Sequence, residues 1–549
     1  MHAAVSRERN ACAKVNKLPV ELLRLIFEFH EATSRHLQYR KSPHPTFTIS
    51  SVCTHWRAVA LSHPAIWSRI DLTSSPRQLK YCGERARHHP LILVFELEDE
   101  EDEDDWANPT PACNFLSERL HQVVDLTIDL ASGGLWSLLL TMSAPLLQRC
   151  EIYSDYHNPE SFAEPLFGDF APQLQYLKLY NLCVPWNMTY LRTLSVLVIS
   201  CDAFFLPRDA TIENEMCLLL IALPNIQSLE LYIRAFSTEP SRIADVPRPT
   251  SRITMQHLHT LTLRMRPQVI QYILSSITTP SVRTLEMTID AVDADSMRAV
   301  STLCHPDVLP PGVFSCVTKL DVEVFQKGDQ NILLQGFAES EDMARVFLLC
   351  WKSSRAMNTQ TLHQVASDIQ QYHVSPSLRT LSIESTRYLG DVISLGGLLQ
   401  RPSLRCFILK GHAINPVLAE LLKAATPQAA NKQPEDVDLM ISDCVLDVGS
   451  ADAIRQWTSV SGRVIRSLDL CDVTFAVVSR NDIERVARSI FDLSNELIWD
   501  LGEHGERHFC CIDENSLCYK LKKTGDLDCG QEYTVESHRR YNHKFVVSW

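Results

Sequence analysis

Sequence patterns that usually accompany catalysis are scarce in this chain of 549 residues. It has only 17 glycines, and neither a G-x-x-x-x-G-K-[ST] phosphate loop nor a G-x-G-x-x-G turn occurs. The H-E-x-x-H and G-x-S-x-G patterns of hydrolases are missing as well. The net charge of −14 disfavours nucleic-acid binding, because an acidic chain repels phosphate backbones. We therefore expect a non-catalytic protein without a cofactor.

Long apolar runs are also lacking. The first fifteen residues, MHAAVSRERNACAKV, carry charges where a secretory signal has an apolar core. The longest apolar stretches, such as residues 135–142, are too short to cross a bilayer. The 18 cysteines are scattered, which indicates reduced, buried thiols rather than a disulfide framework. These features predict a soluble protein of the cytoplasm, the nucleus or both, with no membrane partner.

An amphipathic helix is predicted in residues 16–30, NKLPVELLRLIFEFH, after a disordered stretch at 1–15. Leu18, Leu22, Leu23, Ile26 and Phe27 have the spacing of one helical face. The proline that follows Leu18 suits the first helical turn, where its missing N–H costs nothing.

The next segment, residues 30–45, is polar and predicts a loop. Beyond it, Val52, Trp56, Val59 and Ala60 have the spacing of a second helical face. Pro64 then predicts a break before a short third turn that contains an isoleucine and a tryptophan.

These three blocks, L-P-x-E-L-L-x-x-I-F, V-C-x-x-W-R-x-x-A and a proline followed by I-W-x-x-I, resemble the F-box. The resemblance covers residues 16–72. It implies a three-helix module that docks onto the Skp1 adaptor of a cullin–RING ubiquitin ligase. By the same resemblance, the docking residues are Leu18, Pro19, Leu22, Leu23, Ile26, Phe27, Val52, Cys53, Trp56, Ile66 and Trp67. The alternative is an amphipathic bundle that packs only on its own body.

An acidic run, ELEDEEDEDD at residues 96–105, repels itself and predicts a solvated loop. We interpret residues 73–118, which contain it, as a linker between the helical module and the rest of the chain. A role of the run in recognising a basic partner stays open.

A repeat with the pattern L-x-x-L-x-L, often two residues after a proline, recurs from residue 119 to residue 500. Most copies are about 20 to 35 residues apart, as in leucine-rich repeats. The step from residue 320 to residue 381 is double and indicates a degenerate or inserted copy. The middle apolar residues are Leu126, Cys150, Leu177, Leu197, Leu229, Leu261, Leu285, Leu320, Leu381, Phe407 and Leu468.

Helix-like segments such as ENEMCLLLIAL and QVIQYILSSIT lie between the copies. A short strand alternating with a helix predicts an α/β solenoid with parallel strands inside and helices outside. This body resembles the irregular leucine-rich-repeat domains that many F-box proteins carry after the F-box. The alternative is an irregular α/β domain with ordinary parallel strands.

The polar residues of the predicted strands face away from the core, and acids outnumber bases there by seven to three. Our hypothesis is that this inner face binds a basic segment of a substrate protein, against the alternative of a merely solvated sheet face. The candidate substrate-binding residues are Glu230, Glu286, Asp321, Glu323, Glu384 and Asp469.

Residues 501–549 contain four histidines and four cysteines but no C-x-x-C pair. His504 and His508 have H-x-x-x-H spacing, but the glycine between them disfavours a helix. Zinc needs four such ligands in a tetrahedron, so we expect no metal site. The segments HFCCID, LCYKLKK and HKFVVSW predict short strands that cap the solenoid.

Taken together, these patterns predict a substrate-recognition subunit of a Skp1–cullin–F-box ubiquitin ligase. Its partners would be the adaptor, through it a cullin, and an unknown protein substrate. Two alternatives stay open: a repeat scaffold with no ligase role, and a hydrolase that uses a Cys/His pair near the C-terminus.

Overall fold

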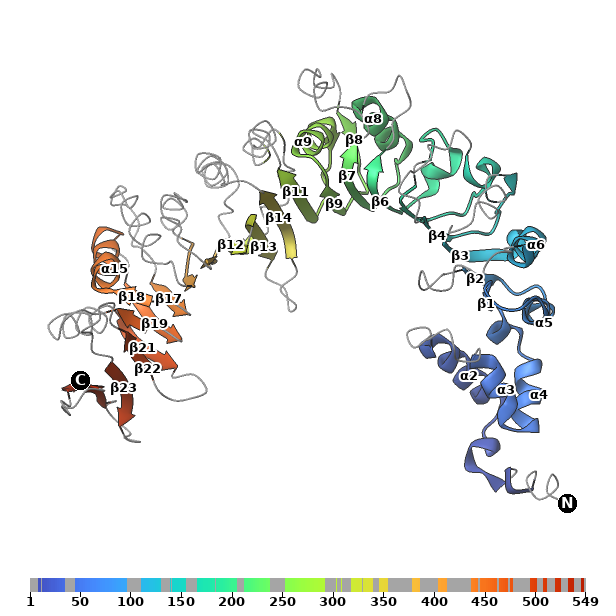
Figure 1. Ribbon diagram of the computed structural model, residues 1–549, viewed down its shortest axis with the longest axis horizontal. Coiled ribbons are helices and arrows are strands. Elements are labelled where there is room, and N and C mark those ends of the chain that lie inside the picture. The colour runs from blue at the N-terminus through green and yellow to red at the C-terminus, as the bar shows by residue number, and fades with distance from the viewer. Residues whose placement is uncertain are drawn as a thin grey trace. The chain divides into compact units, whose positions relative to one another are not determined.

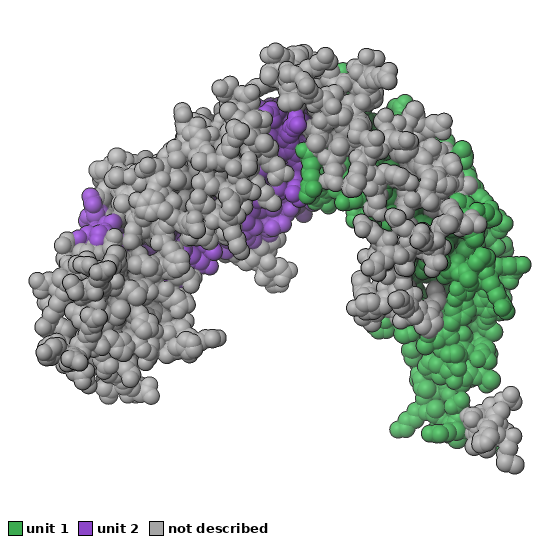
Figure 2. All heavy atoms as spheres, in the orientation of Figure 1, with its two compact units in different colours: residues 1–239 green, residues 240–549 purple. Residues whose placement is uncertain are grey.

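The computed structural model divides the chain into two compact units, residues 1–239 and residues 240–549 (Figure 2). From residue 469 onward it describes the backbone only. The described residues are 8–10, 12–34, 45–95, 110–129, 139, 141–154, 165–182, 184–204, 212–236, 252–291, 303, 308, 317–327, 329–338, 345–353, 378–385, 403–411, 436–442, 445–461, 464–471, 474–476, 494–500, 507–510, 519–524, 532–537 and 545–547.

Unit 1 begins with a helical module. Its elements are η1 (Lys14–Lys17), α2 (Val20–Ser34), α3 (Pro45–Val52), α4 (Thr54–Leu61) and the 3-10 turn η2 (Pro64–Trp67) (Figure 1). Residues 8–10 are helical and η1 starts at Lys14. The predicted disorder of residues 1–15 is therefore wrong for these two segments. The predicted loop also starts too early, because residues 30–34 contain no proline or glycine and continue α2. Residues 35–44 lie outside the described part.

The segment predicted to form the second apolar helical face contains two helices, α3 and α4. Cys53 is extended, with φ −158° and ψ 170°, and its Sγ accepts a hydrogen bond from the backbone N–H of Trp56 at 3.4 Å. Cys53 therefore caps α4 and separates it from α3. Val52 is exposed at the end of α3, whereas Val59 and Ala60 of α4 are buried, so the predicted common face is wrong.

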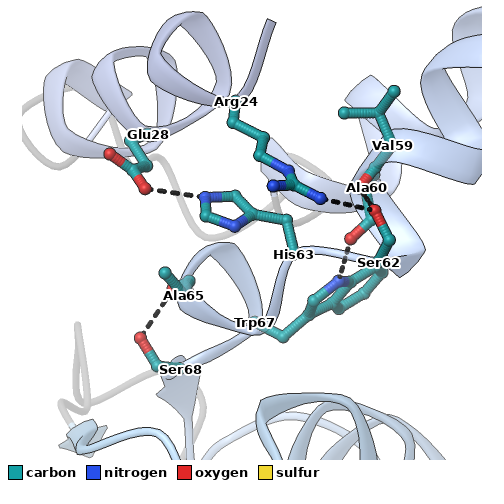
Figure 3. A network of polar contacts seen from close by, with 9 residues as sticks. All are labelled: Arg24, Glu28, Val59, Ala60, Ser62, His63, Ala65, Trp67 and Ser68. Carbon is teal, nitrogen blue, oxygen red and sulfur yellow. Dashed lines mark hydrogen bonds and ion pairs between the residues drawn. The ribbon is translucent and has the colours of Figure 1, made fainter. Parts of the chain in front are cut away.

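Trp67 is the centre of the module's packing. Its side chain is fully buried, with ring centroids 5.7 Å from Phe47 and 5.4 Å from Tyr81. The indole Nε1 donates a 2.8 Å hydrogen bond to the carbonyl oxygen of Ala60 (Figure 3). One side chain thus joins α3, α4 and η2 to the following helix, α5 (Pro76–Ala86).

The sheet of unit 1 is a consecutive parallel ladder, in which each strand pairs with the next along the chain. The predicted markers Leu126, Cys150, Leu177, Leu197 and Leu229 are aligned in register, which confirms the repeat in this unit. The strands are β1 (Arg69–Asp71), β2 (Leu91–Phe95), β3 (Val123–Asp129), β4 (Arg149–Tyr153), β5 (Tyr176–Tyr180), β6 (Val196–Phe204) and β7 (Ser228–Phe236).

Residues 73–118 are not a linker, contrary to the sequence-based prediction. They contribute α5, β2 and α6 (Thr110–Arg119), and β2 pairs with both β1 and β3. The mistake arose because β2, LILVF, lacks the spacing of the other copies and stands directly before the acidic run. The acidic run itself lies outside the described residues.

The connecting elements of unit 1 lie on one face of its strands (Figure 1). Besides α5 and α6 they are η4 (Leu120–Gln122), η5 (Leu166–Asp169), η6 (Thr189–Thr193) and α8 (Ile212–Ala222), the last where a helix was predicted. The strands alternate accordingly: Cys150 and Ile152 of β4 are buried, whereas their neighbours in the strand are half-buried.

The main sheet of unit 2 is mostly parallel, with one inserted meander. Its strands are β9 (Thr260–Arg264), β11 (Thr284–Ala291), β12 (Val317–Lys327), β13 (Asp329–Ala338), β14 (Arg345–Ser353), β15 (Thr380–Ser385), β16 (Cys406–Lys410), β17 (Val437–Ser442), β19 (Ile465–Cys471) and β21 (Ser494–Asp500). β14 pairs with β11 and β12 pairs with β15, while the antiparallel β13 lies between β12 and β14. The meander β12–β14 accounts for the doubled spacing between the repeat copies at residues 320 and 381.

The remaining elements of unit 2 are short. They are β8 (Ile253–Thr254), α9 (Pro267–Ser276), β10 (Ile277–Thr278), β18 (Val445–Asp447), α15 (Val448–Ser461), β20 (Thr474–Ala476), β22 (Arg507–Cys510), β23 (Tyr519–Thr524), β24 (Glu532–Ser537) and β25 (Phe545–Val547). β22, β23 and β25 lie where strands were predicted. In the described residues they belong to a second sheet with β18, β20 and β24, and none pairs with β21. The fold class, α/β with a mostly parallel sheet, is confirmed.

Candidate functional site

Helix α2 exposes a row of large apolar side chains, which we call the α2 stripe. Leu22, Leu25, Ile26 and Phe29 are 46%, 59%, 42% and 72% exposed. Their spacing of three, four and seven residues places them on one face of the helix. Large apolar groups gathered on a small module are more informative than scattered ones, because such patches usually mark a binding surface.

The opposite side of α2 explains why this stripe faces outward. Leu23 and Phe27 are buried, and the Phe27 ring lies 5.1 Å from that of Trp56. Trp56 in turn donates from Nε1 to Oδ1 of Asn16 at 2.6 Å, which attaches η1 to α4. The core of the module therefore takes one apolar face of α2, and the stripe remains outside it.

Two charged residues of α2, Arg24 and Glu28, face the turn between α4 and η2. His63 Nε2 lies 2.6 Å from Glu28 Oε1, and Arg24 Nη2 donates to Ser62 Oγ at 3.4 Å (Figure 3). Each interaction on this partly exposed surface contributes little stability, on the order of 0 to 1 kcal/mol. Their joint effect is on orientation: the polar sector of α2 is held against its own module and the apolar stripe is turned away from it.

The structure divides the eleven predicted docking residues into two groups. Leu23, Phe27, Ile66 and Trp67 are core residues that no partner can contact without unpacking the module, which corrects their assignment. The other seven reach the surface fully or in part: Leu18, Pro19, Leu22, Ile26, Val52, Cys53 and Trp56.

Leu25 and Phe29 were missed by sequence reasoning. Both lie on the stripe and are its most exposed members. A signal was present, since residues 22, 25, 26 and 29 themselves have helical spacing. Two overlapping apolar faces on one helix indicate that it is covered on both sides, by its own core and by something else.

The candidate substrate face is less acidic than predicted, because bases on the same face pair with its acids. Arg345 Nε donates to Glu286 Oε1 at 3.0 Å, and Lys319 Nζ lies 2.8 Å from Asp321 Oδ2. Glu384 stands opposite Lys410 in the register of β15 and β16. Arg345 was overlooked because the motif says nothing about the neighbouring strand. Lys319 lies in the same strand as Asp321, two residues before it, and Lys410 is one of the three bases already counted.

The other predicted substrate-binding residues add little to an acidic surface. Glu230 accepts a 3.1 Å hydrogen bond from the hydroxyl of Tyr232. The side chains of Glu323 and Asp469 lie outside the described part. The described residues thus do not support an unpaired acidic face.

No group of three His, Cys, Asp or Glu side chains in the described part is placed to hold a metal ion. The side chains of the C-terminal cysteines and histidines are outside that part. Among the described helices, none has both the length and the apolar character needed to cross a bilayer. In comparisons with known proteins, neither a family model nor a curated protein matches this chain.

Proposed function

We propose that this protein is a substrate-recognition subunit of a Skp1–cullin–F-box ubiquitin ligase, and that the α2 stripe docks onto the Skp1-type adaptor. The observation that carries the proposal is the outward apolar row formed by Leu22, Leu25, Ile26 and Phe29. Helices that insert into a hydrophobic groove typically use anchors at positions i, i+3, i+4 and i+7, which is the spacing of this row.

The module is suited to docking because it presents the stripe in one orientation. The core residues Leu23, Phe27 and Trp67 fix α2 from one side, and the pairs that Glu28 and Arg24 form fix it from another. A helix that is already ordered loses less conformational entropy on binding, so more of the burial of its apolar side chains is available as affinity.

A subunit that holds a substrate near the adaptor also needs a firm connection between the docking helix and the sheet body. Tyr81 of α5 lies 5.8 Å from Phe47 and 5.4 Å from Trp67, measured between ring centroids. The strand β1 begins two residues after η2 and pairs with β2. A substrate held on the sheet of unit 1 would therefore stay at a defined position relative to the adaptor.

Copurification with the adaptor tests this proposal. The full chain is coexpressed with a Skp1-type adaptor, as wild type and as L22D/F29D. The matched control is L218D/I221D, which places the same charges on two side chains of α8 that are also more than half exposed. We expect adaptor capture by the wild type and by the control, and its loss in L22D/F29D. A wild-type chain that ignores the adaptor would instead support the repeat scaffold without a ligase role.

A further inference from the structure

Tyrosines gather on the face of the unit 1 sheet that is opposite its buried core. Tyr153 ends β4, Tyr176 and Tyr180 begin and end β5, and Tyr232 belongs to β7. In the sheet register Tyr153 is opposite Tyr180, and Arg149 is opposite Tyr176. We call the surface of β4 and β5 formed by Arg149, Tyr153, Tyr176, Lys178 and Tyr180 the tyrosine face.

The two cations of this face are held on aromatic rings. The guanidinium carbon of Arg149 lies 3.7 Å from the centroid of the Tyr176 ring. Lys178 Nζ lies 5.0 Å from the centroid of Tyr153 and donates to the hydroxyl of Tyr153 at 3.0 Å. The rings of Tyr153 and Tyr180 lie 6.1 Å apart. Stacking reduces the freedom of both long side chains and so prepares them for a ligand.

Glu151, the carboxylate on this surface, already has hydrogen-bond and ion-pair partners. Glu151 is only 13% exposed, accepts a 2.5 Å hydrogen bond from the Tyr153 hydroxyl and forms ion pairs with Arg149 and Lys178. Arg149 and Lys178 are 44% and 31% exposed. A guanidinium has five N–H donors and an ammonium three, more than the contacts with Glu151, Tyr153 and Tyr176 use. The exposed parts of both cations can therefore donate to a further acceptor.

We propose that the tyrosine face binds an extended peptide segment carrying one or two carboxylates, with apolar or aromatic side chains lying on the tyrosine rings. Arginine and tyrosine dominate binding energy at protein interfaces, and Arg149 presents the fork geometry that a carboxylate matches. The cations stand on the neighbouring strands β4 and β5, with Asp125 of β3 and Glu230 of β7 beyond them, so the cationic width is about two strands, on the order of 10 Å. That width fits one or two carboxylates and disfavours a polyanion.

This inference reverses the charge of the substrate predicted from the sequence, since it assigns an acidic segment rather than a basic one. It names a substrate class for the sheet body of the proposed ligase subunit. Binding of the peptide, however, does not require the adaptor, so the two proposals can fail separately.

The test uses the full chain and an array of ten-residue peptides in which one or two glutamates stand in a Leu/Tyr/Ser background. Each peptide is paired with its Glu→Gln counterpart. We expect the wild type to bind the acidic peptides about tenfold more tightly than their counterparts, as charge-assisted hydrogen bonds imply. The variant R149Q/E151Q, which removes one charge of each sign, should lose that preference. Y180A should weaken both members of each pair.

Three controls keep the result interpretable. Circular dichroism shows whether R149Q/E151Q retains the wild-type fold, and R149K keeps the charge while removing the fork. The variant L22D/F29D must bind the peptides like the wild type, since it changes only the α2 stripe. Equal binding of acidic and neutral peptides by the wild type, or an acidic preference that survives in folded R149Q/E151Q, would overturn the proposal.

Discussion

Leu22 and Leu23 are neighbours in the chain, yet the side chain of Leu22 is nearly half exposed and that of Leu23 is fully buried. The helical rotation of 100° between them places one on the α2 stripe and the other in the module's core. The two residues therefore separate the proposed docking surface from the module's core within one turn of helix.

Alanine substitutions at this pair should differ strongly in their effect on the stability of the helical module. We expect L23A to lower the opening free energy of the helical module by about 2 to 5 kcal/mol, because it leaves a cavity in the core. L22A should change it by less than about 0.5 kcal/mol, as is usual for exposed positions. Hydrogen exchange of the α2 and α4 amides in the full chain measures both effects. Similar losses in the two variants would contradict the assigned faces.

Gly83 should resist replacement even though it lies within helix α5. An added Cβ would stand 2.8 Å from Cε2 of Phe115, a buried ring of α6. Alanine normally gains about 1 kcal/mol over glycine inside a helix, so helix propensity alone predicts that G83A is stabilising. We expect the clash to prevail and G83A to lower the melting temperature of the full chain. The double variant G83A/F115L should recover part of the loss, whereas no recovery would place the cause elsewhere.

Thiol chemistry should follow burial. Burial raises the pKa of the Cys82 thiol from 9.0 to about 11, whereas Cys12 is exposed. Because the folded state retains this proton longer than the unfolded state, Cys82 contributes stability below pH 9 that is lost as the pH rises toward 11. At pH 8, iodoacetamide should modify Cys12 and spare Cys82 until denaturant is added. Rapid modification of native Cys82 would contradict its burial in α5.

The strand order of unit 2 can be tested with one engineered cysteine. Thr288 of β11 is paired in register with the native Cys350 of β14. Adjacent strands bring their Cα atoms within the range that a disulfide spans. Oxidised T288C should therefore yield a cross-link between residues 288 and 350 in tryptic peptides. A cross-link from E323C to a cysteine at 288, in a T288C/C350S background, would instead place β12 beside β11.

The periodic features of the fold could be read from the sequence. Leucine spacing located the register of unit 1 because each marker fills the same position in one continuous core. The order of β12 to β14 could not be read, because a pattern within one strand does not identify the strand beside it. The linker prediction failed for β2 because a short fully apolar strand carries no repeat signal.

The position of the proposed docking helix could be predicted from the sequence, but the exposure of its side chains could not. The motif located α2, yet the roles of Leu23 and Trp67 depend on how α2, α4 and η2 pack together, which only their contacts reveal. The acidic surface was predicted from selected positions of single strands, whereas Lys319 pairs with Asp321 within β12 and Arg345 pairs with Glu286 across two strands. Charge on a sheet face is a property of several strands together.

We propose that the α2 stripe docks the adaptor, and an alanine scan of affinity tests this docking. The dissociation constant of the purified chain for a Skp1-type adaptor is measured by calorimetry for L22A, L25A, I26A and F29A, with L218A and I221A as controls. Among the four stripe variants, we predict that at least two weaken binding about tenfold or more, while both α8 controls bind like the wild type. Wild-type affinity in all four stripe variants, or no binding by the wild type itself, would contradict the account.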